Sequence, residues 1–129
     1  KAIHCDTPLP NTGRYFYKMQ LKLSCTPPNF RLGIIGRSPA TEVTIRAGDE
    51  DVVMYYCFDK SNQMIYSGPQ KSQGFGLGVY DVLTVAIDMD KKKVEWLIQG
   101  QQHAATDFSP SLAASKEVYF FLQCYVTGD

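Results

Sequence analysis

Several features that accompany catalysis or charge-driven binding are scarce in this sequence of 129 residues. Lysine and arginine together number 13, as do aspartate and glutamate, so no net charge attracts nucleic acid or an anionic membrane over a distance. No apolar run approaches the ~20 residues of a membrane-spanning helix. Histidine occurs only as His4 and His103, and neither stands in a pattern typical of a catalytic centre. We therefore expect a protein that is not an enzyme and that binds neither nucleic acid nor a membrane.

Acceptor sites for N-glycosylation are also missing, since no asparagine is followed two positions later by serine or threonine. The four cysteines are compatible with two disulfides in an oxidising compartment. However, Cys25, Cys57 and Cys124 stand in apolar or inward-facing positions, which is typical of buried thiols. We expect free thiols and a location in the cytoplasm or nucleus.

The clearest structural signal lies between Tyr80 and Gly100. Apolar residues alternate with polar or small ones up to Asp88, a charged tip follows, and the alternation resumes at Val94. This pattern predicts a β-hairpin. Trp96 is in phase with the apolar residues of the second arm, so we expect it in the core.

The period of two recurs along most of the remaining chain and predicts further strands. These cover Tyr15–Leu23, Phe30–Ile34, Val43–Ala47, Met64–Tyr66 and Val118–Val126, and a continuous apolar run predicts another over Val52–Phe58. Sheets with one apolar face must cover each other. The predicted fold class is therefore all-β, a two-layer antiparallel β-sandwich in one domain of residues 1–129, with residues 1–13 as a lead-in.

Four segments differ from this pattern. Residues 68–78 hold four glycines and read as a long irregular segment, and a turn at 99–101 precedes a short polar stretch up to Phe108. Residues 109–116 fit either a loop or one helical turn. The strand 118–126 is apolar on both faces, so either both faces are covered by other parts of the protein or one apolar face is exposed and prone to association.

Several segments follow one another in an order known from one protein family. Gly13–Tyr17 places a glycine and a basic residue before aromatic residues. Asp81–Asp90 is similar to a Gly-Asp-Val-Ile-Gly-x-Gly-x-Asp-Leu-Asp run, and Val94–Gly100 to an Ile-x-Phe-x-x-Asn-Gly arm. Val118–Asp129 looks like a Leu-Tyr-Pro-x-Val-x-Leu segment that ends in Gly-Asp. Together with Phe58-Asp59 and the segment 65–68, these stretches resemble the SPRY domain family.

The resemblance implies a concanavalin-like jelly roll that acts as a protein–protein interaction module and needs no cofactor. In the family, a last strand follows the Gly-Asp found here at Gly128-Asp129, so that strand is either missing or supplied from elsewhere. Thr84 and Ala86 stand where the family commonly has glycine, Gln99 replaces its usual asparagine, and Tyr80 replaces a small residue.

Other chemical readings of the sequence are weaker. The acidic run 49–51 and the pair Asp88 and Asp90 lack the further oxygen ligands of a calcium loop, so we expect solvated turns and no metal site. Residues 74–78 superficially resemble a phosphate loop, but a strand follows where a helix is needed. The three lysines 91–93 are typical of a soluble hairpin tip.

A rigid sandwich presents its loops at the two ends of the sheets, where recognition occurs at low entropic cost. The resemblance implies that loops at one rim bind a peptide or a partner protein, often as the recognition domain of a larger protein. The loops concerned are 37–41, 59–63 and 68–75. Arginine and tyrosine frequently anchor interfaces. The predicted ligand-binding residues are Arg37, Tyr56, Tyr66, Gln73 and Phe75.

Two alternatives remain open. The first is a carbohydrate-binding domain on a related lectin-like sandwich, although the calcium-ligand run and the His/Arg/Trp sugar motifs of such families are not visible. The second is a small enzyme, which the missing acid–base constellation disfavours.

Overall fold

The computed structural model describes residues 2–4, 7–20, 29–39, 44–59, 62–78 and 80–125. Within these ranges the chain forms ten strands and one short helix. The strands are β1 (Ala2–His4), β2 (Arg14–Gln20), β3 (Asn29–Ile35), β4 (Val52–Asp59), β5 (Asn62–Ser67), β6 (Gln70–Gln73), β7 (Val82–Asp88), β8 (Lys93–Ile98), β9 (Gln101–Asp107) and β10 (Tyr119–Tyr125), and the helix is α1 (Pro110–Ala113).

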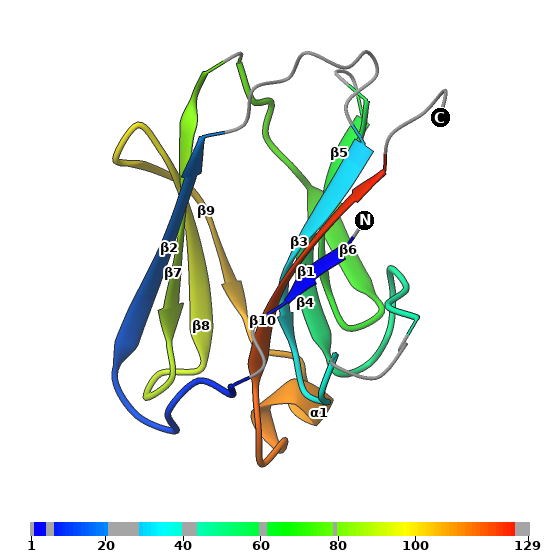
Figure 1. The fold of residues 1–129 in the computed structure, drawn as a ribbon, viewed down its shortest axis with the longest axis vertical. Coiled ribbons are helices and arrows are strands. Elements are labelled where there is room, and N and C mark those ends of the chain that lie inside the picture. The colour runs from blue at the N-terminus through cyan, green and yellow to red at the C-terminus, as the bar shows by residue number, and fades with distance from the viewer. Residues whose placement is uncertain are drawn as a thin grey trace.

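The strands form two antiparallel sheets that face each other as the layers of a sandwich (Figure 1). One sheet has four strands in the order β2-β7-β8-β9, on the left in Figure 1. The other has six strands in the order β1-β10-β3-β4-β5-β6, on the right. The predicted fold class, a two-layer antiparallel β-sandwich, is confirmed.

The predicted hairpin supplies much of the layer between the sheets. β7 and β8 pair in register from Leu83 opposite Ile98 to Asp88 opposite Lys93. Their inward side chains meet apolar residues of β3, β4 and β10, and Trp96 is fully buried among them. At the β2 edge, the Tyr17 ring stacks on the Phe120 ring with centroids 3.9 Å apart. Burial of this layer is the main driving force for association of the sheets.

A second apolar cluster lies on the outer face of the six-stranded sheet, which is the face turned away from the other sheet. It contains Ile35, Val52, Met54, Tyr56, Tyr119 and Phe121, and it is covered by Ile45 from the segment that precedes β4. In β10, Phe120 therefore points into the first cluster while Tyr119 and Phe121 point into the second. Of the two alternatives left open for this doubly apolar strand, the structure shows cover on both faces for residues 118–121. Val126 and Gly128-Asp129 lie outside the described residues.

The predicted strand 43–47 is wrong for its described part. Residues 44–47 have no strand conformation, and Val43 lies outside the described residues. Ile45 is buried and its neighbours Thr44 and Arg46 are exposed, so the alternation in the sequence reflects packing onto a sheet without pairing in one. Arginine side chains bind the backbone carbonyls here, since Arg31 donates to Ile45 O at 2.7 Å.

Three strands were missed because each is short, polar or both. Residues 2–4, assigned to the lead-in, form β1 and pair with β10. Part of the segment predicted as irregular forms β6, and the polar stretch before Phe108 forms β9. All three lie at sheet edges, where a strand has one neighbour and its side chains need no apolar alternation. The remaining strands are confirmed over their described residues, and of the two alternatives for residues 109–116 the structure shows the helical turn, α1.

Gly33 is required by the close approach of β3 and β4. A Cβ atom added at this position would lie 1.9 Å from the carbonyl oxygen of Val53 and 2.8 Å from the Cα of Met54. Both atoms belong to the backbone of a central strand and cannot move without disturbing the ladder.

We expect Gly33→Ala to lower the free energy of unfolding by about 1–3 kcal/mol, because it overpacks a buried position. Gly76→Ala is the matched control, since a Cβ at Gly76 meets nothing within 4 Å. Urea unfolding of the two variants measures the difference. Equal midpoints for both variants would contradict the close approach.

Candidate functional site

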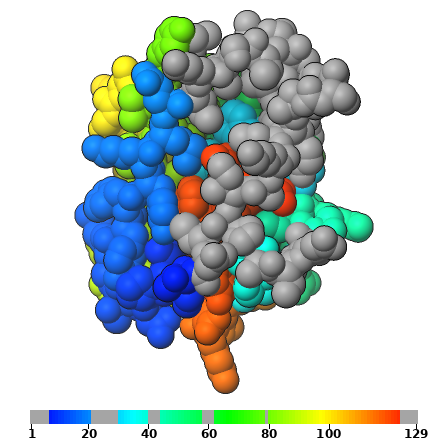
Figure 2. Space-filling view, in the orientation of Figure 1, coloured from blue at the N-terminus to red at the C-terminus, as the bar shows by residue number. Residues whose placement is uncertain are grey.

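One end of the sandwich gathers the loops around α1, and we call it the α1 rim. It comprises the residues that follow β3 and precede β4 (36–39 and 44–51), the turn 68–69, and the segment 108–118 that contains α1 (Figure 1). In Figure 2 the orange segment around α1 projects from this end of the molecule. Strand pairing brings these loops to the same end. β3 ends at Ile35, opposite the start of β4 at Val52, and β5 ends at Ser67, opposite the start of β6 at Gln70.

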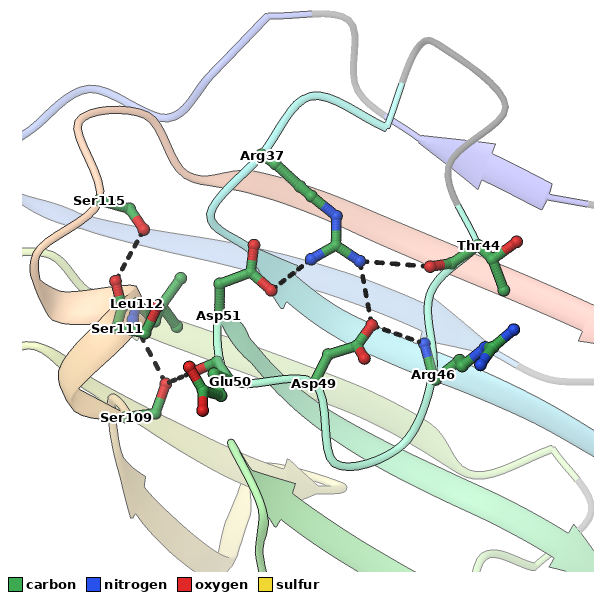
Figure 3. Close-up of polar contacts among 10 residues, drawn as sticks. All are labelled: Arg37, Thr44, Arg46, Asp49, Glu50, Asp51, Ser109, Ser111, Leu112 and Ser115. Atoms are coloured by element: carbon green, nitrogen blue, oxygen red, sulfur yellow. Dashed lines mark hydrogen bonds and ion pairs between the residues drawn. The ribbon is translucent and has the colours of Figure 1, made fainter.

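Arg37 holds the loop between β3 and β4 in shape (Figure 3). Its guanidinium donates to the carboxylate of Asp51, to Asp49 Oδ2 at 2.9 Å and to the carbonyl oxygen of Thr44 at 3.2 Å. Partial burial alone would lower the pKa of Arg37, but the hydrogen bonds that it donates to Asp49 and Asp51, together with their negative charges, raise this pKa above its usual value. Arg37 is thus a permanently charged clamp whose two terminal nitrogens donate within the loop.

The same loop is joined to α1 through Ser109. The Ser109 hydroxyl donates to the carbonyl oxygen of Glu50 at 2.6 Å and accepts from the backbone N–H of Leu112 at 3.3 Å (Figure 3). The second contact is a helix N-cap, with Pro110 in the first turn as its fixed φ allows. The side chain of Ser67 donates to the carbonyl oxygen of Asp107 at 2.7 Å and so links the two sheets. The loops of the α1 rim therefore support one another.

A groove of about 560 Å³ opens at this rim between the edge strands β6 and β9. Its walls are formed on one side by Ser67, Pro69, Gln70, Lys71 and Ser72, and on the other by Ala105, Thr106, Asp107, Phe108, Ser109 and Pro110. A smaller hollow of about 280 Å³ adjoins it at Pro69 and Pro110 and extends it toward Glu50 and Ser111. We call these two hollows together the rim groove. It holds charges of both signs, Lys71 on one wall and Asp107 on the other.

The predicted ligand-binding residues do not converge on this groove. Tyr56, Tyr66 and Gln73 share the outer face of the six-stranded sheet, because Tyr56 and Gln73 both pair with Met64, and Tyr66 pairs with Met54. Tyr56 is buried there under Arg31, whose guanidinium lies 4.3 Å from the centre of its ring. Gln73 is exposed at the sheet edge.

Phe75 lies on the opposite side of that sheet, in the gap between the two layers. Its ring stacks on Tyr55 with centroids 4.6 Å apart and meets the ring of His103 from β9 at 5.8 Å. The Tyr55 hydroxyl donates to the carbonyl oxygen of Phe75. Phe75 therefore closes the sandwich between its sheets, which is a structural role.

The three loops predicted to act together lie at two ends of the molecule. The loops that begin at Arg37 and Gly68 belong to the α1 rim, whereas the hairpin between Asp59 and Asn62 closes the far ends of β4 and β5. Lys60 and Ser61 at its tip, and residues 40–41 of the first loop, are outside the described residues.

The groove residues were missed because their signal is weak. Lys71 and Asp107 belong to polar edge strands that no hydrophobic pattern predicts. Only the dipeptide Gly68-Pro69, with a positive φ of 58° at Gly68, marks a tight turn that could have located the groove.

The acidic residues considered as metal ligands in the sequence make other contacts here. Asp49 and Asp51 bind Arg37, and Asp88 Oδ1 accepts from the N–H groups of Asp90 and Lys91 in the hairpin tip. Across the described parts of the chain, no three metal-ligating side chains cluster. Within the same ranges, no helix has the length and apolar character to cross a bilayer.

Comparison with solved structures relates this architecture to known proteins. The chain superposes on the SPRY domain of human HERC1 with a TM-score of 0.64 and 18% identity, covering 98% of this chain and 71% of that one. It superposes on the PSpry domain of TRIM65 with a TM-score of 0.68 and 11% identity, covering 97% of this chain and 66% of that one. The chain has the SPRY fold. No protein-family model and no curated protein matches the sequence.

The Arg37 clamp stabilises the rim of this SPRY fold and is open to test. We expect Arg37→Ala to lower the free energy of unfolding by roughly 1–2 kcal/mol, since it removes charge-assisted hydrogen bonds at a partly exposed site. Arg37→Lys should restore little, because an ammonium does not reproduce the planar fork. The matched control is Arg46→Ala, because the Arg46 side chain points away from Arg37 and its carboxylate partners (Figure 3). Thermal unfolding of the three variants measures these effects, and an Arg37→Ala variant as stable as wild type would refute the clamp.

The burial of Tyr55 leads to a second prediction, which concerns the stability of the fold at alkaline pH. Burial, with a smaller contribution from Cys57, raises the pKa of Tyr55 above its ordinary value. In the unfolded chain the phenol ionises above about pH 10, while in the fold it stays neutral. The unfolded state therefore binds fewer protons there, and stability falls as the pH rises above 10.

Tyr55→Phe should lower stability by about 1 kcal/mol at pH 8, where the hydroxyl makes its hydrogen bond. It should then lose less stability than wild type between pH 9 and 11. The exposed-ring variant Tyr80→Phe should follow wild type across this range. Urea unfolding at several pH values makes the comparison, and parallel declines for Tyr55→Phe and wild type would count against this account.

Proposed function

We propose that this chain is a non-catalytic protein–protein interaction module that binds a peptide or partner protein through the α1 rim, as the recognition domain of a larger protein. The observation that carries the proposal is the rim groove. Its volume falls within the ~300–1,000 Å³ range of binding clefts, and it opens between loops that Ser67, Ser109 and Arg37 hold in place. A preorganised site of this kind loses little entropy on binding.

The chemistry of the rim groove suits an extended polypeptide segment. Pro69 and Pro110 are exposed and offer apolar contacts. Lys71 can bind a carboxylate of the partner, and Asp107, which lies 3.6 Å from Lys93 Nζ, can bind an amine or amide. β6 and β9 flank the groove, and within the described residues each pairs on one side only, so their outward amide and carbonyl groups are available to a partner backbone. The SPRY fold of the chain supports this function by analogy.

A carbohydrate ligand is less well supported. Sugar sites commonly rest a ring on an exposed aromatic face, but the aromatic residue that lines the groove, Phe108, is buried. Asp49 and Asp51, the acidic side chains nearest to a calcium-site pattern, bind Arg37.

We further propose that the protein works in the cytoplasm or nucleus. Cys57 is buried in β4 and forms no disulfide, which suits a reducing compartment. Cys25, which carried the same prediction, lies outside the described residues.

Affinity purification followed by direct titration of the identified partner tests the proposed binding site. Lys71→Ala and Asp107→Ala should each weaken binding at least tenfold, about 1.4 kcal/mol, with unchanged melting temperatures because both side chains are exposed. Lys91→Ala is the matched control, since it removes an exposed lysine outside the groove. Equal affinity of all three variants would exclude the rim groove, and specific binding of a glycan would favour the lectin alternative.

A further inference from the structure

A second surface hollow lies on the outer face of the four-stranded sheet, away from the α1 rim. It has a volume of about 800 Å³ and is lined by Phe16, Lys18, Val82, Thr84, Leu97, Gln99 and Gly100. We call it the sheet hollow. Figure 2 shows β2, whose outward side chains contribute to this hollow, in blue on the left of the molecule.

The strand registers explain how this hollow forms. Lys18 pairs with Thr84, which pairs with Leu97, so these three side chains lie in one row across β2, β7 and β8. Phe16 pairs with Ala86 in the adjacent row. Thr84 and Ala86 are only 6% and 3% exposed, although they point outward, because their small side chains lie below larger neighbours. The central strand β7 therefore forms the floor of the sheet hollow, and side chains of β2 and β8 form its walls.

The walls carry exposed aromatic surface. The two large apolar residues that are most exposed in the described chain are Phe16, at 56%, and Tyr80, at 58%. Phe16 belongs to the hollow, and Tyr80 lies near its end, where its carbonyl oxygen accepts from Gln20 Nε2 at 2.8 Å. Aromatic surface left open beside a hollow is typical of a contact site.

Backbone strain is concentrated at the same end of this face. Tyr80 and Gln99 have positive φ angles of 69° and 51°, which are uncommon for residues other than glycine. Gln99 is held there by Val82, since Gln99 N donates to Val82 O at 3.0 Å and Val82 N donates to Gln99 Oε1 at 2.9 Å. The positive φ of Gln99 belongs to the two-residue hairpin turn Gln99-Gly100 between Ile98 and Gln101, so Tyr80 is the strained residue at this end.

The charge of the hollow identifies the class of group that it suits. Lys18 is the one charged residue in its lining, and it takes part in none of the ion pairs found among the described residues. Arg14, at the margin, lies 3.8 Å from Asp88 and 3.9 Å from Glu95, while its guanidinium lies 5.4 Å from the centre of the Phe16 ring. A carboxylate placed at Lys18 would complete an ion pair beside this apolar surface.

We infer that the sheet hollow is a second docking surface, which binds an extended protein segment carrying an apolar side chain and a carboxylate two residues apart. Phe16 and Lys18 are themselves two residues apart on one strand, about 7 Å, so the partner residues match their spacing. The apolar side chain enters the hollow beside Phe16, above the floor at Thr84. The carboxylate pairs with Lys18. This surface does not depend on the rim groove and allows the chain to hold two partners, or two parts of one.

Titration of the isotopically labelled 129-residue chain with two peptide pools, followed by NMR, tests this inference. The first pool consists of randomised nonapeptides with a fixed central Leu-x-Asp or Phe-x-Glu pattern, and the second has Lys or Arg in place of the acid. The acidic pool should shift the amide signals of Phe16, Lys18 and Thr84, and the basic pool should not. Equal shifts from both pools, no shifts, or shifts confined to the rim groove would overturn the inference.

Variants separate this surface from the rim groove and from effects on folding. Phe16→Ala should weaken binding of the acidic pool at least tenfold, while Phe16→Leu should keep most of it. Lys18→Glu should reverse the preference in favour of the basic pool, a result that general destabilisation cannot produce. Lys71→Ala, in the rim groove, should bind the acidic pool as wild type does. Unchanged preference in Lys18→Glu, or the same shifts produced by a panel of oligosaccharides, would refute a docking surface for acidic protein segments.

Discussion

The apolar layer between the two sheets is the interaction on which the rest of the structure depends. Trp96 and its neighbours in β7 and β8 are covered by β3, β4 and β10, and removal of this surface from water holds the layers face to face. Every other feature uses that scaffold. The α1 rim forms where strands of both sheets end, and the sheet hollow forms on the face that the layer leaves turned to solvent. The residues of these two surfaces can therefore differ without altering the inner layer.

The parts of the fold that could be predicted from sequence are those whose side chains meet the core. The hairpin around Trp96 and the doubly apolar β10 were predicted correctly, because alternation directly reports which side of a strand is buried. β1, β6 and β9 were not, since an edge strand is defined by backbone pairing that polar residues also permit. Ile45 shows the converse case, in which alternation arises from a segment that packs on a sheet while arginine side chains bind its carbonyls.

The candidate site was harder to predict than the fold. Sequence reasoning selected residue types that often anchor interfaces, but in the structure Arg37 binds Asp49 and Asp51, Tyr56 lies under Arg31, and Phe75 fills the gap between the layers. Whether an arginine or tyrosine is available to a partner depends on tertiary neighbours that sequence spacing does not specify. The rim groove itself is built from small and polar residues, so its shape follows from where strands end.

The pairing of β1 with β10 has a consequence for how the protein is made. Ile3 lies opposite Leu122, so β1 must wait until the much later β10 has emerged from the ribosome before the two strands can pair. Contacts so distant along the chain carry a large loop-closure cost and slow folding. Until then, the apolar edge formed by β3 has no neighbour on that side, and nascent chains need protection from one another during this interval.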